Sequence, residues 1–199
     1  HEACKRIGLV KLKNLAIGMA MEQLFDSKNK QIQIKMHEVW MDTVTMTSCA
    51  MGALEVCAKQ KHIREETLFL ACLAHNIGML AILNEAETNP SEYATDAFLN
   101  ETANRLSPIL GGQILKQWEF EQPVIYAVEH WRRRETDESK KRIDYVDYLR
   151  LGAALNGYYG EKQDRMIRHC KSKGMFKHPD LLECERYHEI SQAVLASFI

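Results

Sequence analysis

Residues 73–78 read Leu73-Ala74-His75-Asn76-Ile77-Gly78, and they lie where a strongly apolar helical segment meets a glycine. Adjacent side chains diverge at the end of a helix, so a histidine followed there by an aspartate can direct two ligands at one metal ion. Asparagine is neutral and binds hard cations far more weakly. A histidine on an apolar helix is also commonly a hydrogen-bonded core residue. With asparagine at residue 76, this stretch therefore indicates a protein that functions by binding and signalling rather than by metal-dependent catalysis.

The segments on either side of this stretch carry helical patterns. Apolar residues recur at helical spacing, and no alternating run is long enough to form a strand. Four prolines and ten glycines are the only strong interruptions. We therefore predict an all-α fold, with helices over about 10–25, 34–59, 65–76, 79–85, 91–106, 108–118, 123–134, 145–159, 163–173 and 179–199.

Two of these boundaries depend on local signals. Ser107-Pro108 fits a helix cap followed by proline at the first helical position, which predicts a helix start there. Gly78 predicts a break or kink after residue 76.

Composition argues against several classes of partner. The chain has 199 residues, 46% of them hydrophobic and 27% charged, with a net charge of −1. This balance gives no overall attraction to nucleic acid or to a membrane surface. The longest apolar stretch, Leu68 to Leu83, is short and has His75 and Asn76 at its centre, which disfavours a membrane span.

Six cysteines occur without a Cys-x-x-Cys pair. Three of them (Cys49, Cys57 and Cys72) lie in apolar helical patterns, which favours buried free thiols in a reducing cytoplasm over zinc or disulfides. The first residue is His1 rather than methionine, so we expect the chain to start inside a longer protein.

Two basic segments are further candidates. Arg132-Arg133-Arg134 and Lys140-Lys141-Arg142 are interrupted by acids, and we predict a solvated loop between helices. The segment from Arg165 to Lys173 is a basic helix that could meet phosphate or an acidic partner, with surface solubility as the simpler interpretation. We expect no nucleic-acid partner.

Several phrases in order resemble the HDOD domain, a divergent branch of the HD phosphohydrolase superfamily found in bacterial signalling proteins. These phrases are residues 7–16, Val39-Trp40, residues 73–78, 110–118, 123–131 and 143–149. The resemblance implies an HD/HDOD-type helical domain over residues 1–160, with N-terminal helices missing. The remainder, 161–199, is predicted to be a C-terminal helical extension that packs on the same domain.

The same resemblance implies where the metal ligands of an active relative would fall. They map to Asp42, to His75 and Asn76, to Ser107, to His130 and Trp131, and to Asp147. Only His75, His130 and Asp147 keep the residue type of the family. A hydrolytic two-metal site needs enough ligands to hold the ions and to lower the pKa of a bound water. The resemblance therefore implies a vestigial pocket around Asp42, His75, Asn76, His130 and Asp147.

We accordingly expect a non-catalytic regulatory or scaffold module in bacterial signal transduction, without a cofactor or a divalent metal. It would bind a signalling protein or a small ligand, and it could form a homo-oligomer. The alternative is a metal-dependent phosphohydrolase with a reduced site, for instance zinc on His75, His130 and Asp147. We expect His75 and His130 to reach one shared cavity.

Overall fold

The computed structural model describes residues 9–89, 96–133, 142–176 and 181–198, and this part of the chain forms helices and connecting turns without a strand. The predicted all-α class is confirmed. The elements are α2 (Leu9–Glu22), α3 (Lys30–Val56), α4 (Glu65–Ala74), α5 (Gly78–Thr88), α6 (Asp96–Gln117), α7 (Gln122–His130), α8 (Tyr145–Leu155), η1 (Gly160–Lys162), α9 (Gln163–Ser172) and α10 (Glu185–Leu195).

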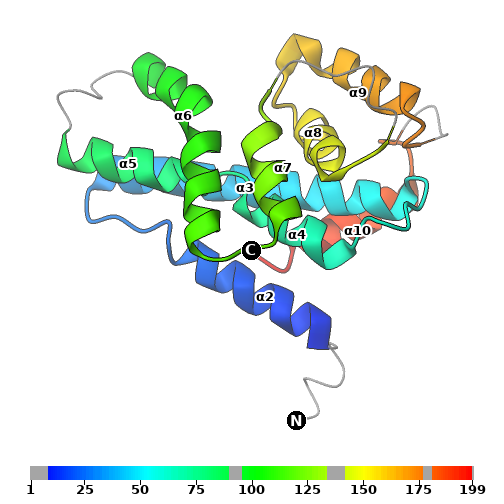
Figure 1. Ribbon diagram of the computed structural model, residues 1–199, viewed down its shortest axis with the longest axis horizontal. Helices are drawn as coiled ribbons and strands as arrows, with labels where there is room; N and C mark the ends of the chain where they lie inside the picture. Colours follow the sequence, from blue (N-terminus) through cyan, green and yellow to red (C-terminus); the bar gives the residue numbers. More distant parts are fainter. Residues whose placement is uncertain (1–8, 90–95, 134–141, 177–180, 199) are drawn as a thin grey trace.

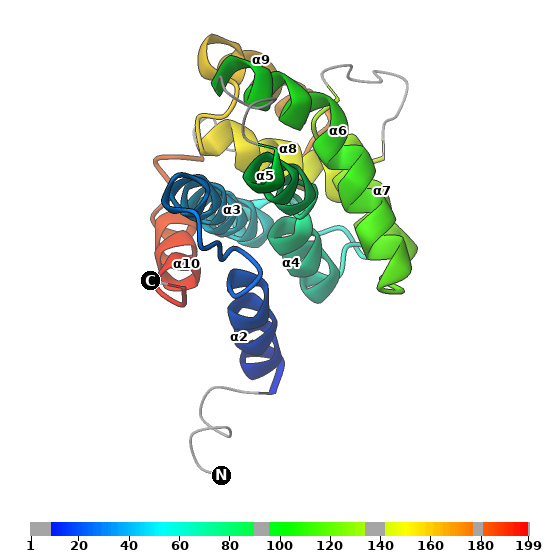
Figure 2. The same cartoon turned by 90° about the vertical axis from the view of Figure 1, so that its left-hand side faces the viewer.

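Helix α3 is the central element, and α4, α5, α8 and α10 all pack against it (Figure 1, Figure 2). The side chain of Asn29 caps its N-terminus by accepting hydrogen bonds from the backbone N–H groups of Gln31 and Ile32. Small residues allow close approach along α3. A Cβ on Gly52 would overlap Tyr187 and Ser191 of α10, and one on Gly152 of α8 would press on α3.

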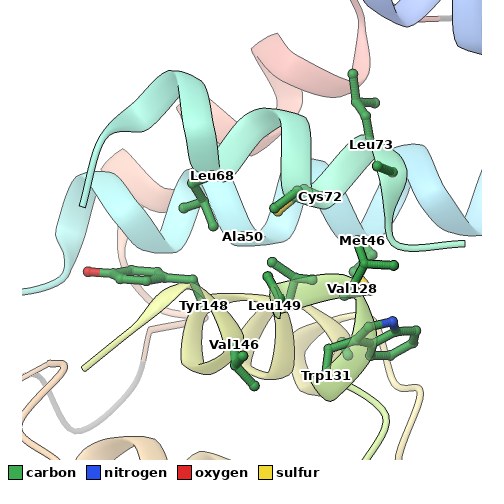
Figure 3. Close-up of a cluster of buried hydrophobic side chains, with 14 of the residues drawn as sticks. Met46, Ala50, Leu68, Cys72, Leu73, Val128, Trp131, Val146, Tyr148 and Leu149 are labelled. Atoms are coloured by element: carbon green, nitrogen blue, oxygen red, sulfur yellow. The ribbon is translucent and has the colours of Figure 1, made fainter. Parts of the chain in front are cut away.

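The buried core lies where α4, α7 and α8 meet α3 (Figure 3). The labelled side chains in this part of the core come from α3, α4, α7 and α8 and from the residue after α7. They include Met46, Ala50, Leu68, Cys72, Leu73, Val128, Trp131, Val146, Tyr148 and Leu149. The five cysteines among the described residues are free, and all but Cys184 are buried. Cys4 lies outside the described residues.

The apolar stretch Glu65–Thr88, which spans α4 and α5, has the length and mean hydropathy (1.6) of a membrane span. Within its most apolar window, however, 83% of the residues are buried against the other helices. A helix that is apolar on all sides is expected in the core of a helical bundle. The packing on α3, α6 and α7 therefore accounts for this hydrophobicity.

The predicted helix start at Ser107-Pro108 is wrong. Helix α6 runs without a break from Asp96 to Gln117, and Pro108 lies inside it. Ser107 is fully buried and its hydroxyl has no hydrogen-bond partner among the described residues, so it caps nothing. An internal proline costs about 3 kcal/mol. Packing of α6 against α5 and α7 offsets this cost, which local sequence signals do not register.

Gly78 marks a close crossing of α5 and α6. A Cβ at this position would overlap the carbonyl oxygen of Ser107 and press on the backbone nitrogen of Gly111. Because backbone atoms cannot move aside cheaply, we expect Gly78→Ala to lower the free energy of unfolding by about 2 to 3 kcal/mol in urea titrations.

Gly112→Ala is the matched control for this crossing. The atoms nearest to its added Cβ all belong to the flexible side chain of Glu129. Alanine also favours the helix, so we expect a change below about 1 kcal/mol. If Gly78→Ala and Gly112→Ala lowered the free energy of unfolding equally, the close crossing of α5 and α6 would be contradicted.

The helices after residue 160 pack on the same body. Helix α9 lies on α8, and α10 lies along α3. At the end of α9, Lys173 forms an ion pair with Asp147 of α8, and the backbone N–H of Ala58 donates to the carbonyl of Met175. The division of the chain at residue 160 stays a prediction.

Candidate functional site

A cavity of about 990 Å³ lies between α6 and α9, and we call it the α6–α9 cavity. Helix α9 and the first turns of α6 lie at the same end of the molecule, at the top of both views (Figure 1, Figure 2). The cavity walls also include residues from α3, from the start of α5 and from the turns after α7 and α8. Of the five predicted pocket residues, Asp42 and Asn76 line it. His75, His130 and Asp147 do not.

His75 caps the C-terminus of α4 and is a core residue. Its side chain is 1% exposed, and its Nδ1–H donates to the carbonyl oxygen of Cys72 at 2.5 Å. The edge of the Trp131 ring packs against it, with ring centroids 4.9 Å apart. Burial lowers the pKa of His75 to about 3. The imidazole is therefore neutral at physiological pH and has the role of a hydrogen-bonded core side chain.

This burial predicts a loss of stability in acid. His75 takes up a proton near pH 6.5 when unfolded but only near pH 3 when folded, so the unfolded state binds the extra proton between these values. Stability is therefore lost as the pH falls through this window. We expect about 2 kcal/mol of loss between pH 7 and pH 5 from this one group.

The measurement is the free energy of unfolding at several pH values for wild type and His75→Asn. The variant should show the smaller pH dependence, while His37→Asn, at an exposed position, should keep the wild-type dependence. If His75→Asn does not fold, an NMR titration of wild type decides, since a ring that titrates near pH 6.5 contradicts the burial.

Asn76 is held by two hydrogen bonds. Its Nδ2 donates to the hydroxyl of Thr43 at 3.2 Å, and its Oδ1 accepts from Nη2 of Arg132 at 2.9 Å. The amide thus uses one of its two N–H groups and its oxygen in these contacts. An aspartate here could not donate to Thr43, so the asparagine matches its neighbours.

Arg132 is the central charged group of the cavity wall. Its Nη1 donates to Oδ1 of Asn104 at 2.8 Å and to the hydroxyl of Tyr158 at 3.0 Å. The guanidinium also lies over the rings of Trp131 and Tyr158, at 4.7 and 5.5 Å from their centroids. Burial lowers the Arg132 pKa, yet an arginine stays charged at neutral pH. Arg132 lies in the connection between α7 and α8, as predicted, but its side chain packs into the cavity wall instead of extending into solvent.

Arg150 explains why Arg132 lies in this place. This buried arginine of α8 donates to the carbonyl oxygens of His130, Trp131 and Arg133. It thereby satisfies backbone groups that the end of α7 leaves free. The turn after α7 is fixed as a result, and Arg132 points into the cavity wall. Residues 134–141 of the predicted basic loop lie outside the described residues.

Asp42 lies on α3 near Arg132. Desolvation raises the pKa of its carboxyl group, Glu38 one turn earlier raises it further, and the Arg132 charge opposes both effects. A guanidinium therefore lies near both Asn76 and Asp42, two of the positions at which the family resemblance implies metal ligands.

The other two predicted pocket residues are engaged elsewhere. His130 stacks on Tyr126 and its Nδ1–H donates to the carbonyl oxygen of that residue at 2.9 Å. Asp147 forms a capping box with Asp144 at the start of α8 and an ion pair with Lys173. We expected His75 and His130 to reach one shared cavity. The α6–α9 cavity is not that shared cavity, because neither histidine lines it.

These side chains do not fit the metal centre that the fold family implies. In the described ranges, no three histidine, cysteine, aspartate or glutamate side chains come together as a metal site. The donors that remain are separated: His75 is buried against Trp131, and Asp147 is paired with Lys173. No chemical step can be derived through a metal ion here, and the zinc alternative on His75, His130 and Asp147 lacks a common centre.

Sequence reasoning missed most of the cavity wall. Asn104, Tyr158 and Lys162 gave no sequence signal, because each is an ordinary surface residue type. Arg165, Arg168 and His169 were singled out as part of a basic helix, and all three line the cavity. The density of basic residues in this predicted helix was the signal that pointed to them.

The comparisons with known proteins agree with this architecture. The family model of the HDOD domain matches residues 1–133, about two thirds of the chain. The chain belongs to the HDOD family. The resemblance read from the sequence is thereby confirmed, together with the HD-type fold. No curated protein matches this HDOD chain.

One solved structure is similar along the whole HDOD chain. It is a crystal structure from Shewanella amazonensis SB2B, whose protein is named, provisionally, a metal-dependent phosphohydrolase. The two are 29% identical with a TM-score of 0.86, and the match covers 100% of this chain and 72% of that one. The HD superfamily is thus supported by fold and by sequence.

Proposed function

We propose that this HDOD chain is a non-catalytic regulatory or scaffold module in bacterial signal transduction, which acts by binding a protein or a small ligand. The observation that carries the proposal is the hydrogen bond between the Arg132 guanidinium and the Asn76 amide in the cavity wall. By the family resemblance, Asn76 stands at the position of the HD aspartate, and its oxygen accepts a hydrogen bond from a fixed cation of the chain itself.

The chemistry of this substitution disfavours hydrolysis. A divalent ion in a hydrolytic site lowers the pKa of a bound water and makes a nucleophile at neutral pH. A guanidinium cannot bind water as a Lewis acid, and its positive charge repels a divalent ion that approaches the same oxygens. Arg132 is also anchored to Asn104 and Tyr158, so it cannot leave its place without breaking those hydrogen bonds.

A phosphoesterase assay tests the proposal. Wild type should not hydrolyse bis(p-nitrophenyl) phosphate or p-nitrophenyl phosphate above the buffer rate with Mn²⁺, Mg²⁺, Zn²⁺ or Fe²⁺. Metal-dependent turnover that disappears in Asn76→Ala would contradict it and would favour the phosphohydrolase alternative, which the name of the Shewanella structure suggests. Lys171→Ala, an exposed change on α9, is the control for contaminating activity.

A further inference from the structure

The α9 side of the cavity is strongly basic. Lys162, Arg165 and Arg168 line it, and Arg132 adds a fourth positive charge from the turn after α7. Among the described residues that line the cavity, Asp42 is the single acidic one. Like charges around a hollow with low-dielectric walls reinforce each other and raise the local concentration of anions.

These three cations, Lys162 at the end of η1 and Arg165 and Arg168 in α9, also lack ion-pair partners. Among the residues that the structure describes, Lys162, Arg165 and Arg168 form no salt bridge and no side-chain hydrogen bond. Other cations of the chain behave differently: Lys173 pairs with Asp147, and Lys116 pairs with Glu129. The charge on the α9 wall is therefore available to an incoming anion.

The opposite wall has a different chemistry. Asn76, Asn100 and Asn104 supply amide groups, and the lining also includes the apolar residues Val39, Met79 and Ala103. Amides and small apolar surfaces recognise uncharged polar molecules through paired hydrogen bonds and contact area. The two walls together match a ligand with one charged end and one uncharged end.

We propose that the α6–α9 cavity binds a small organic phosphate, with its phosphate groups against Lys162, Arg165 and Arg168 and its uncharged part against the asparagine wall. The proposal rests on the binding role given under the proposed function and names the ligand class for it. A volume of about 990 Å³ lies at the upper end of the range for small-molecule sites, which fits a molecule larger than inorganic phosphate.

Calorimetric titration at low ionic strength, with EDTA present to exclude metal-mediated binding, tests this assignment. The probes are pyrophosphate, ADP and adenosine. We expect pyrophosphate to bind with a Kd of about 1 mM or tighter, ADP to bind at least as tightly, and adenosine alone to bind more weakly than ADP. Added salt should weaken the first two, because it screens the cations.

Two double variants with the same loss of charge make the comparison sharp. Arg165→Ala/Arg168→Ala removes cations from the cavity, and we expect at least about a tenfold rise in the Kd for pyrophosphate and ADP. Lys59→Ala/Lys171→Ala removes two exposed cations that do not line the cavity, and its Kd should stay within about twofold of wild type. Thermal melts of both variants check that they are folded.

Each outcome decides a separate point. Absence of pyrophosphate binding, or equal weakening in both double variants, would overturn the phosphate site. ADP that binds about tenfold more weakly than pyrophosphate would overturn the role of the asparagine wall. Phosphate release with added Mn²⁺, measured on the same samples, instead concerns the proposed function. Release would refute the non-catalytic role while binding to the cavity still held.

Discussion

Lys173→Met should lower the free energy of unfolding by about 3 to 5 kcal/mol, measured by urea titration at pH 7. The Lys173 ammonium lies 2.5 Å from Oδ2 of Asp147, and the two side chains are 10% and 4% exposed. Removal of the lysine leaves a carboxylate buried without its counter-charge, which costs far more than the pair itself contributes. The pair also joins the end of α9 to the start of α8, so its loss should loosen the α9 wall of the cavity.

The controls separate the buried charge from the loss of a lysine. Lys171→Met, at an exposed position two residues earlier, should change stability by less than about 0.5 kcal/mol. The double variant Asp147→Asn/Lys173→Met should recover part of the loss, because no unpaired charge remains. A Lys173→Met variant as stable as Lys171→Met would contradict the buried ion pair.

Trp131→Ala should cost about 3 to 5 kcal/mol for a different reason. The Trp131 ring is almost fully buried, packs edge-on against His75, and donates a hydrogen bond from Nε1 to the His75 carbonyl oxygen at 3.2 Å. Its removal leaves a void between α4 and α7 and an unpaired carbonyl. It also withdraws the ring over which the Arg132 guanidinium lies.

Trp118→Ala provides the comparison. The Trp118 side chain is 49% exposed at the end of α6, and we expect its loss to cost less than about 1 kcal/mol. In Trp131→Ala the pKa of His75 should also rise toward its usual value, because water reaches the ring. Similar destabilisation by the two tryptophan variants, or an unchanged His75 titration by NMR, would contradict this packing.

The fold followed from sequence where one segment carried several signals at once. Around residues 73–78, an apolar helix, a polar pair and a glycine all agreed, and the structure has α4, His75, Asn76 and the start of α5 in that order. At Ser107-Pro108 the local signals also agreed with one another, but the helix start that they predicted is wrong. The buried contact between α6 and Gly78 decides that helix, and it joins residues about thirty positions apart.

The site was harder to read because it depends on which side chains meet. The apolar pattern around His75 favoured a core histidine, whereas the family resemblance implied a ligand position. The burial of His75 against Trp131 agrees with the core interpretation. Arg132 fitted a solvated loop, because sequence cannot show that Arg150 fixes the turn after α7. The basic side of α9 was visible as a helical pattern, but the cavity it faces is formed by α3, α5 and α6.

The most direct test of the central claim is the metal content of wild-type protein. The protein would be purified without chelators, equilibrated with Mn²⁺, Fe²⁺, Zn²⁺ and Mg²⁺, dialysed, and analysed by inductively coupled plasma mass spectrometry. The Arg132 guanidinium, bound to Asn76 and near Asp42, predicts less than about a tenth of an equivalent of each metal in folded protein. About one equivalent or more, lost in Asn76→Ala but kept in Lys171→Ala, would contradict it.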